Sequence, residues 1–83
     1  MSDDELIALE ELTVVCAVTP EWVRERVEEG LLPAAPEWRF SALAVRRVRR
    51  MVALERDFDA VPELAALMAD LLEELDALRA RLR

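Results

Sequence analysis

The chain has 83 residues and a formal net charge of −7, from 11 basic and 18 acidic side chains. A chain of this length forms one small domain with a limited core, for which association with a second copy is a common remedy. The acidic balance argues against non-specific binding to nucleic acid or to an anionic membrane surface, and it permits a basic partner.

The residue types that the chain lacks also limit its chemistry. Lysine, histidine, asparagine, glutamine and tyrosine are absent, so every basic residue is arginine. Without histidine there is no ordinary zinc site and no histidine-activated nucleophile. Gly30, the only glycine, cannot by itself make a glycine-rich phosphate loop. We therefore expect no enzyme, no catalytic residue, no cofactor and no metal.

The single cysteine and the hydropathy pattern indicate the compartment. Cys16 lies among Leu12, Val15 and Val18 and is expected to be a buried structural thiol, which fits a reducing environment. No apolar run approaches the ~20 residues of a membrane span, and the acidic N-terminus does not resemble a signal peptide. These features predict a cytoplasmic protein without a membrane partner.

The first elements along the chain are short. Residues 6–9 form an extended lead-in, and residues 10–16 form a helix whose Leu12, Val15 and Cys16 face the core. A second helix begins at Thr19-Pro20, because threonine can cap free backbone donors and proline suits the first turn. That helix ends by Gly30, which accepts the left-handed conformation.

The second helix has an acidic side. At about 100° per residue, four glutamates fall in one sector while Val23 and Val27 point the opposite way. A DNA-reading helix with this face in the major groove would meet phosphates with like charge. The face is either a solvated surface, as most charge runs are, or a docking surface for a basic partner, with Trp22 beside it as a contact. The four residues are Glu21, Glu25, Glu28 and Glu29.

A wing and a third helix follow. Trp38 and Phe40 alternate with Arg39, which predicts a short strand or wing with one buried face. Ser41 is the expected N-cap of a helix that runs to about residue 57. Its buried stripe is Ala44, Val45, Val48, Met51 and Val52, and its outer side carries Arg46, Arg47, Arg49 and Arg50. These arginines can contact phosphates, pair with the chain's own acids or be solvated; we expect pairing or solvation, because acids outnumber arginines.

The final helix carries a heptad pattern typical of a paired helix. This stripe comprises Val61, Leu64, Met68, Leu71, Leu75, Leu78 and Leu82. Packing only against its own domain is the alternative, but the last three leucines extend far for so small a body, so we expect a homodimer. Its orientation stays open, since Glu74 can oppose Arg81 in an antiparallel pair or Arg79 in a parallel pair. The helix also has an acidic flank, at Asp70, Glu73, Glu74 and Asp76, which is most simply solubilising.

The order of these motifs resembles a known family. The lead-in, the Thr19-Pro20 start, the Gly30-Leu31-Leu32-Pro33 exit and the Trp38-Arg39-Phe40 wing resemble the MerR-type helix-turn-helix module. With the leucine-rich final helix, residues 7–83 look like a chaperone-modulatory protein of the CbpM family. That resemblance implies a protein that binds the J-domain of a DnaJ-type (CbpA-type) co-chaperone and regulates its work with DnaK. J-domains present a basic helix to DnaK, which the glutamates of residues 21–29, or the acidic flank of the last helix, can cover.

The predicted architecture is a single all-α domain, with a winged helix-turn-helix body over residues 7–58, a minimal wing, and a long coiled-coil-like dimerisation helix over residues 60–83. Two other functions stay open. One is a MerR-like DNA-binding regulator that uses arginines of the wing and third helix, which a dimer would place on two half-sites; DNA is the less expected partner, because most base-reading side chains except arginine are missing. The other is a purely structural dimerisation module.

Overall fold

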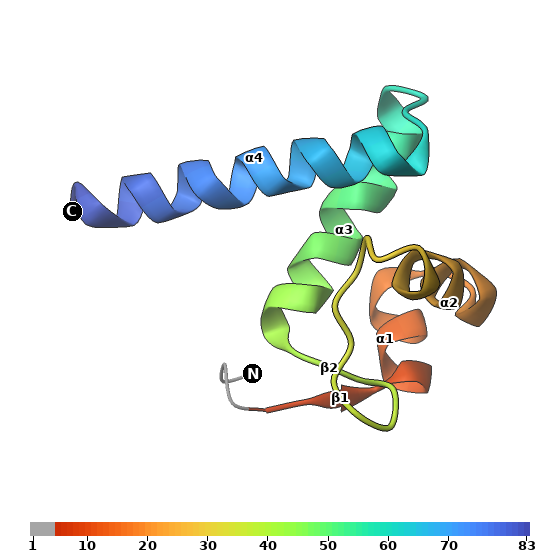
Figure 1. Ribbon diagram of the computed structural model, residues 1–83. Helices are drawn as coiled ribbons and strands as arrows, with labels where there is room; N and C mark the ends of the chain where they lie inside the picture. The colour runs from red at the N-terminus through yellow and green to blue at the C-terminus, as the bar shows by residue number, and fades with distance from the viewer. Residues whose placement is uncertain (1–4) are drawn as a thin grey trace. The chain divides into compact units, whose positions relative to one another are not determined.

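The computed structural model describes residues 5–83 and contains four helices and two short strands in those residues. The elements are β1 (Ile7–Ala8), α1 (Leu9–Cys16), α2 (Pro20–Glu28), β2 (Arg39–Phe40), α3 (Ala42–Asp57) and α4 (Pro62–Arg81), as Figure 1 shows. The predicted all-α class with a minimal wing is confirmed. The chain divides into two compact units; the first ends at Arg49 and the second begins at Arg50, so α3 contributes to both.

In the first unit, α1 and α2 pack together beside a two-stranded antiparallel sheet. Ile7 pairs with Phe40 and Ala8 with Arg39, which ties the start of the chain to the wing, residues 35–40. The wing is closed by a hydrogen bond from the Ala35 N–H to the Arg39 carbonyl oxygen, at 2.8 Å. The core of this unit contains Leu9, Leu12, Cys16, Val23, Leu32, Phe40, Ala44, Val45 and Val48.

Local sequence explains where α2 begins and ends. The Thr19 side chain accepts a hydrogen bond from the Trp22 N–H at 3.1 Å, and Pro20 occupies the first turn. At the other end, the Gly30 N–H donates to the Val27 carbonyl and the Leu31 N–H to the Arg26 carbonyl, which is a Schellman motif. Gly30 has φ of 77°, a conformation that costs L-residues with a side chain about 1–2 kcal/mol. The expected limits of this helix are therefore correct to within one residue.

One of the predicted core positions of α1 is wrong. Val15 was expected in the core, but it is 45% exposed, and Leu9, the first residue of α1, is buried instead. Because α1 starts at Leu9 rather than Glu10, Leu9 joins Leu12 and Cys16, at spacings of three and four residues, on the buried side of the helix. Val15 falls outside that stripe.

The third helix also differs from expectation at one position. Ser41 caps it as predicted, accepting a hydrogen bond from the Ala44 N–H at 3.2 Å, and most of the predicted stripe is buried, with Val52 half-buried. Arg47, however, was placed on the outer side and is only 8% exposed. It lies three residues after Ala44 and four before Met51, on the buried side of the helix.

The second unit combines the end of α3 with α4. Its buried apolar residues are Met51 and Leu54 from α3 and Ala65, Ala66 and Ala69 from α4. An ion pair between Arg50 and Asp76 joins the two helices. From Glu74 to the end of the chain every residue is exposed, so the C-terminal half of α4 has no cover within the described chain.

Candidate functional site

The acidic face of α2 is exposed in the structure. Glu21, Glu25, Glu28 and Glu29 all have exposed side chains, while Val23 is buried beneath the helix. A carboxylate oxygen of Glu25 lies 3.3 Å from the Arg26 guanidinium, an ion pair that offsets part of the charge. Three of the four carboxylates thus have no ion pair among residues 5–83, and the face presents a net negative charge to solvent.

Trp22 lies beside these glutamates but is only half-exposed. The Arg26 guanidinium carbon is 4.2 Å from the centre of the Trp22 indole ring, a cation–π arrangement. Arg26 itself is 7% exposed. Sequence reasoning did not identify this buried arginine, although its position four residues after a tryptophan on the same helix is the signal that finds it. The Trp22 ring is therefore in contact with Arg26 at the edge of the acidic face.

Arg24 is tied to the wing rather than to the acidic face. Its guanidinium carbon lies 6.0 Å from the centre of the Trp38 ring, whose own neighbour is the buried Phe40 ring at 6.5 Å. Trp38 and the preceding Glu37 both have positive φ, 55° and 62°, which two bulky residues adopt only when their surroundings impose it. Trp38 is 37% exposed, so of the two aromatic residues only Phe40 fills the predicted buried face.

The second acidic set lies on α4. Asp70, Glu74 and Asp76 are exposed and Glu73 is half-buried. Asp76 pairs with Arg50, and Asp70 and Glu73 make interactions of their own. The two acidic sets belong to different units of the chain, so each is a separate candidate surface. The set on α2 is the less neutralised of the two.

The predicted dimerisation stripe is largely uncovered. Met68 is half-buried, and the other stripe residues are exposed: Val61, Leu64, Leu71, Leu75, Leu78 and Leu82. Leu67 and Leu72, which widen the stripe, are exposed as well. An apolar surface that continues along a helix of 20 residues is larger than isolated exposed leucines would create.

The arginines of α3 are not one cluster. Arg47 is buried and its Nε donates to the Leu31 carbonyl oxygen at 2.8 Å, which fastens α3 to the chain just after α2. Arg50 pairs with Asp76. The expected pairing with the chain's own acids is confirmed for Arg50, while Arg46 and Arg49 are exposed.

The remaining chemistry is sparse. Cys16 is buried, its Sγ lies 3.9 Å from the Val45 carbonyl oxygen, and burial raises the pKa of the thiol more than the nearby Arg49 lowers it. Among residues 5–83, no three histidine, cysteine or carboxylate side chains gather as metal ligands would. Within the same range, neither α4 nor a shorter helix has the uninterrupted apolar length needed to cross a bilayer.

The order of these elements is a helix-turn-helix, α1 and α2, followed by a wing and two further helices. The family model of the MerR helix-turn-helix regulatory proteins matches residues 7–83, nearly the whole chain. The chain belongs to the MerR family. This membership accounts for the helix-turn-helix and wing, and it is consistent with action on either DNA or protein. No curated protein and no solved structure matches the chain.

Proposed function

We propose that this MerR-family protein is a chaperone modulator, which binds the J-domain of a DnaJ-type co-chaperone and regulates its cooperation with DnaK. The observation that carries the proposal is the exposed acidic face of α2. On a helix-turn-helix protein, this is the helix that would enter the major groove, and its charge suits a basic protein surface better than a phosphate backbone.

The resemblance to the CbpM family points to the same partner. J-domains carry a basic helix, and the acidic face offers Glu21, Glu28 and Glu29 to it without an internal ion pair within the described chain. Trp22, fixed by Arg26, supplies an aromatic contact at the edge of the face. The acidic flank of α4 is the second candidate contact on the protein.

Two charge-matched variants test this proposal. The first, E21Q/E25Q/E28Q/E29Q, and the second, D70N/E73Q/E74Q/D76N, each remove four negative charges from one surface. Titration against the J-domain from the same organism, at low and at physiological salt, measures the effect. We expect binding that weakens with salt and a loss of about tenfold or more, roughly 1.4 kcal/mol, in the first variant.

The comparison between the variants separates the surfaces. A larger loss in the second variant would move the docking site to α4. Unchanged affinity in both, with helical content retained by circular dichroism, would show that neither acidic surface docks the J-domain. No binding of the wild-type protein at either salt concentration would contradict the chaperone function itself.

DNA binding is the second candidate function, and one local feature favours it. Arg24 and Arg39 line a pocket of about 340 Å³ beside Trp38 and the start of α1, next to the wing. Glu10 and Glu37 line the same pocket and oppose phosphate binding there. A DNA-binding protein would show an affinity that falls steeply with salt, and R24Q/R39Q would reduce both the affinity and the salt slope.

The proposed modulator acts as a homodimer held through α4. The exposed leucine stripe supports this assembly, because pairing two such helices removes the apolar surface from water. Dimerisation also places two acidic faces on one particle, so that two J-domains can be held together and the avidity exceeds that of one contact.

A further inference from the structure

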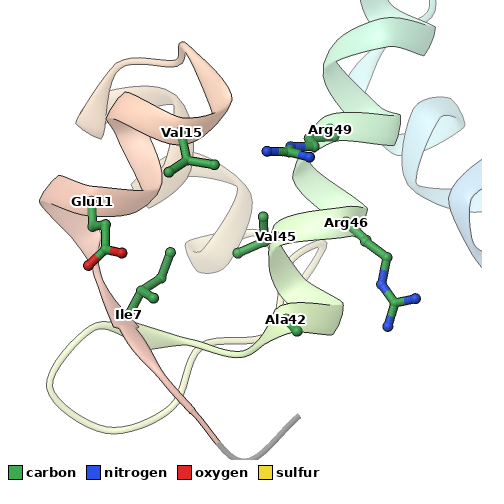
Figure 2. A pocket seen from close by; sticks show the side chains of 7 residues that line it. All are labelled: Ile7, Glu11, Val15, Ala42, Val45, Arg46 and Arg49. Atoms are coloured by element: carbon green, nitrogen blue, oxygen red, sulfur yellow. The ribbon is translucent and has the colours of Figure 1, made fainter. Parts of the chain in front are cut away.

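The first unit contains an open pocket that neither the acidic face nor the leucine stripe uses. It has a volume of about 580 Å³ and lies between β1 and α1 on one side and α3 on the other. This volume lies within the range of ordinary ligand sites. Figure 2 shows its labelled side chains.

The floor of this open pocket, called the groove below, is apolar. Ile7, Val15, Ala42 and Val45 line it, from the strand, from α1 and from α3. Val15, the residue that does not join the core, contributes its exposed surface here. Figure 2 shows Ile7, Val15 and Val45 pointing into the space between the two helices. The groove can therefore receive aliphatic side chains.

The charge around the groove differs from that of the whole protein. Arg46 and Arg49 stand three residues apart on α3, against Glu11 alone from α1. In Figure 2 the Arg49 guanidinium reaches toward α1, while Arg46 extends outward from α3. Within the described chain, no carboxylate pairs with either guanidinium, although the chain as a whole carries a charge of −7. The groove thus combines an apolar floor with two guanidinium groups that pair with no carboxylate of residues 5–83, of which Arg49 also interacts with the Cys16 thiol.

We propose that this groove binds an acidic, apolar segment of a partner protein. An aliphatic side chain of the segment packs between Val15 and Val45, and a neighbouring carboxylate is held by the guanidinium of Arg49, with Arg46 at the rim. Guanidinium is the side-chain group whose geometry best matches a carboxylate, through two parallel N–H···O bonds. Apolar contact alone would not select among segments, so the arginines provide the specificity.

The proposed segment is opposite in charge to the basic surface expected at α2. Its binding does not require the proposed J-domain interaction. The protein would then offer two surfaces of opposite sign, one for a basic partner and one for an acidic segment.

The experiment uses two short fluorescent peptides and the full-length protein. One peptide alternates leucine and aspartate, and its control alternates leucine and asparagine. Fluorescence anisotropy measures affinity, and amide shifts in NMR spectra locate the site. We expect the aspartate peptide alone to bind, in the range of tens to hundreds of micromolar, with the largest shifts at Ile7, Val15 and Val45.

Variants of the groove test the role of its charge. R46Q/R49Q should lower the affinity for the aspartate peptide at least fivefold. R79Q/R81Q removes the same charge from exposed residues of α4 and should leave that affinity unchanged. V15E, which places a carboxylate on the floor at an exposed position, should also abolish binding. Thermal melting by circular dichroism checks that each variant is folded.

Three results would overturn the proposal. One is equal affinity for the two peptides. Another is peptide-induced shifts confined to the leucine stripe of α4. The third is a change of the Ile7 and Val45 shifts on dilution without peptide, which would show that a second copy of the chain occupies the groove.

Discussion

At the scale of single residues, burial of Cys16 predicts a pH dependence of stability. Burial raises the pKa of its thiol, because the thiolate loses hydration in the core, and Arg49 offsets only part of that effect. The chain has no lysine, tyrosine or histidine, so Cys16 is the only side chain that titrates between neutral pH and about pH 11. Comparison with Cys16→Ala, which keeps the α-amino group of the chain, therefore isolates the contribution of this thiol to stability.

The sign of the pH dependence follows from the raised pKa. The folded state holds the proton more tightly than the unfolded chain, so the free energy of unfolding is highest below about pH 9 and falls as the pH rises beyond it. We expect urea unfolding midpoints to fall between pH 8 and about pH 10.5 in the wild type, and to stay level in Cys16→Ala. An equal fall in both proteins would assign the effect to another group.

Ala17 is a second residue whose conformation predicts an effect on the free energy of unfolding. It ends α1 in the left-handed conformation, with φ of 55°, where L-residues other than glycine are strained. Ala17→Gly should therefore raise the free energy of unfolding by about 1 kcal/mol. Ala34→Gly, in an exposed loop without positive φ, is the matched control and should be neutral or slightly destabilising. The measurement is urea denaturation. Equal effects of the two substitutions would show that the left-handed conformation at Ala17 does not lower stability.

At the scale of elements, a buried guanidinium fastens α3 to the chain that follows α2. The Arg47 Nε donates to the Leu31 carbonyl oxygen at 2.8 Å, one residue beyond the glycine that ends α2. This hydrogen bond acts on the same exit segment as the Schellman hydrogen bonds of Gly30 and Leu31. Removing its side chain leaves a carbonyl group of this segment without its donor.

Arg47→Leu should destabilise the protein by about 1–3 kcal/mol, the usual cost of an unsatisfied buried polar group. Arg46→Leu changes the same residue type at the adjacent, exposed position and should stay within about 0.5 kcal/mol of the wild type. Thermal and urea unfolding give both values. Comparable losses in the two variants would indicate that removing an arginine from α3, rather than losing this hydrogen bond, is responsible.

The helix limits and the acidic face could be predicted because they depend on local sequence. Thr19, Gly30 and Ser41 each act on a helix end within a few residues, and the helical period alone places the glutamates of α2 on one side. The buried arginines could not be predicted from charge, because Arg26 is covered by a cation–π contact and Arg47 by a carbonyl 16 residues away in the sequence. The groove beside Val15 could not be predicted either, because its lining residues come from segments that lie far apart in the sequence.

At the scale of the whole molecule, the leucine stripe of α4 is the surface through which we propose that two copies of the chain associate. Leu75→Glu/Leu78→Glu places four carboxylates in the seam of the proposed dimer, two from each chain. Burying a leucine contributes about 1.5–3 kcal/mol, so the dimer dissociation constant should rise more than about a hundredfold.

Analytical ultracentrifugation at micromolar concentrations measures the effect. Ala77→Glu/Ala80→Glu, at exposed positions off the stripe, adds the same charge and should remain dimeric. A wild-type protein that sediments as a monomer over this range would contradict the dimer. A dimer that survives both substitutions would place the interface elsewhere.

The placement of the two tryptophans has an optical consequence. Trp22 and Trp38 both belong to the first unit, and the chain has no tyrosine, so the tryptophan emission reports on that unit alone. Circular dichroism, in contrast, is strongly influenced by the 20 residues of α4. Emission and ellipticity thus report on different parts of one small chain. Coincident melting curves would mean that the two units unfold as one cooperative system, and separated curves that each has its own transition.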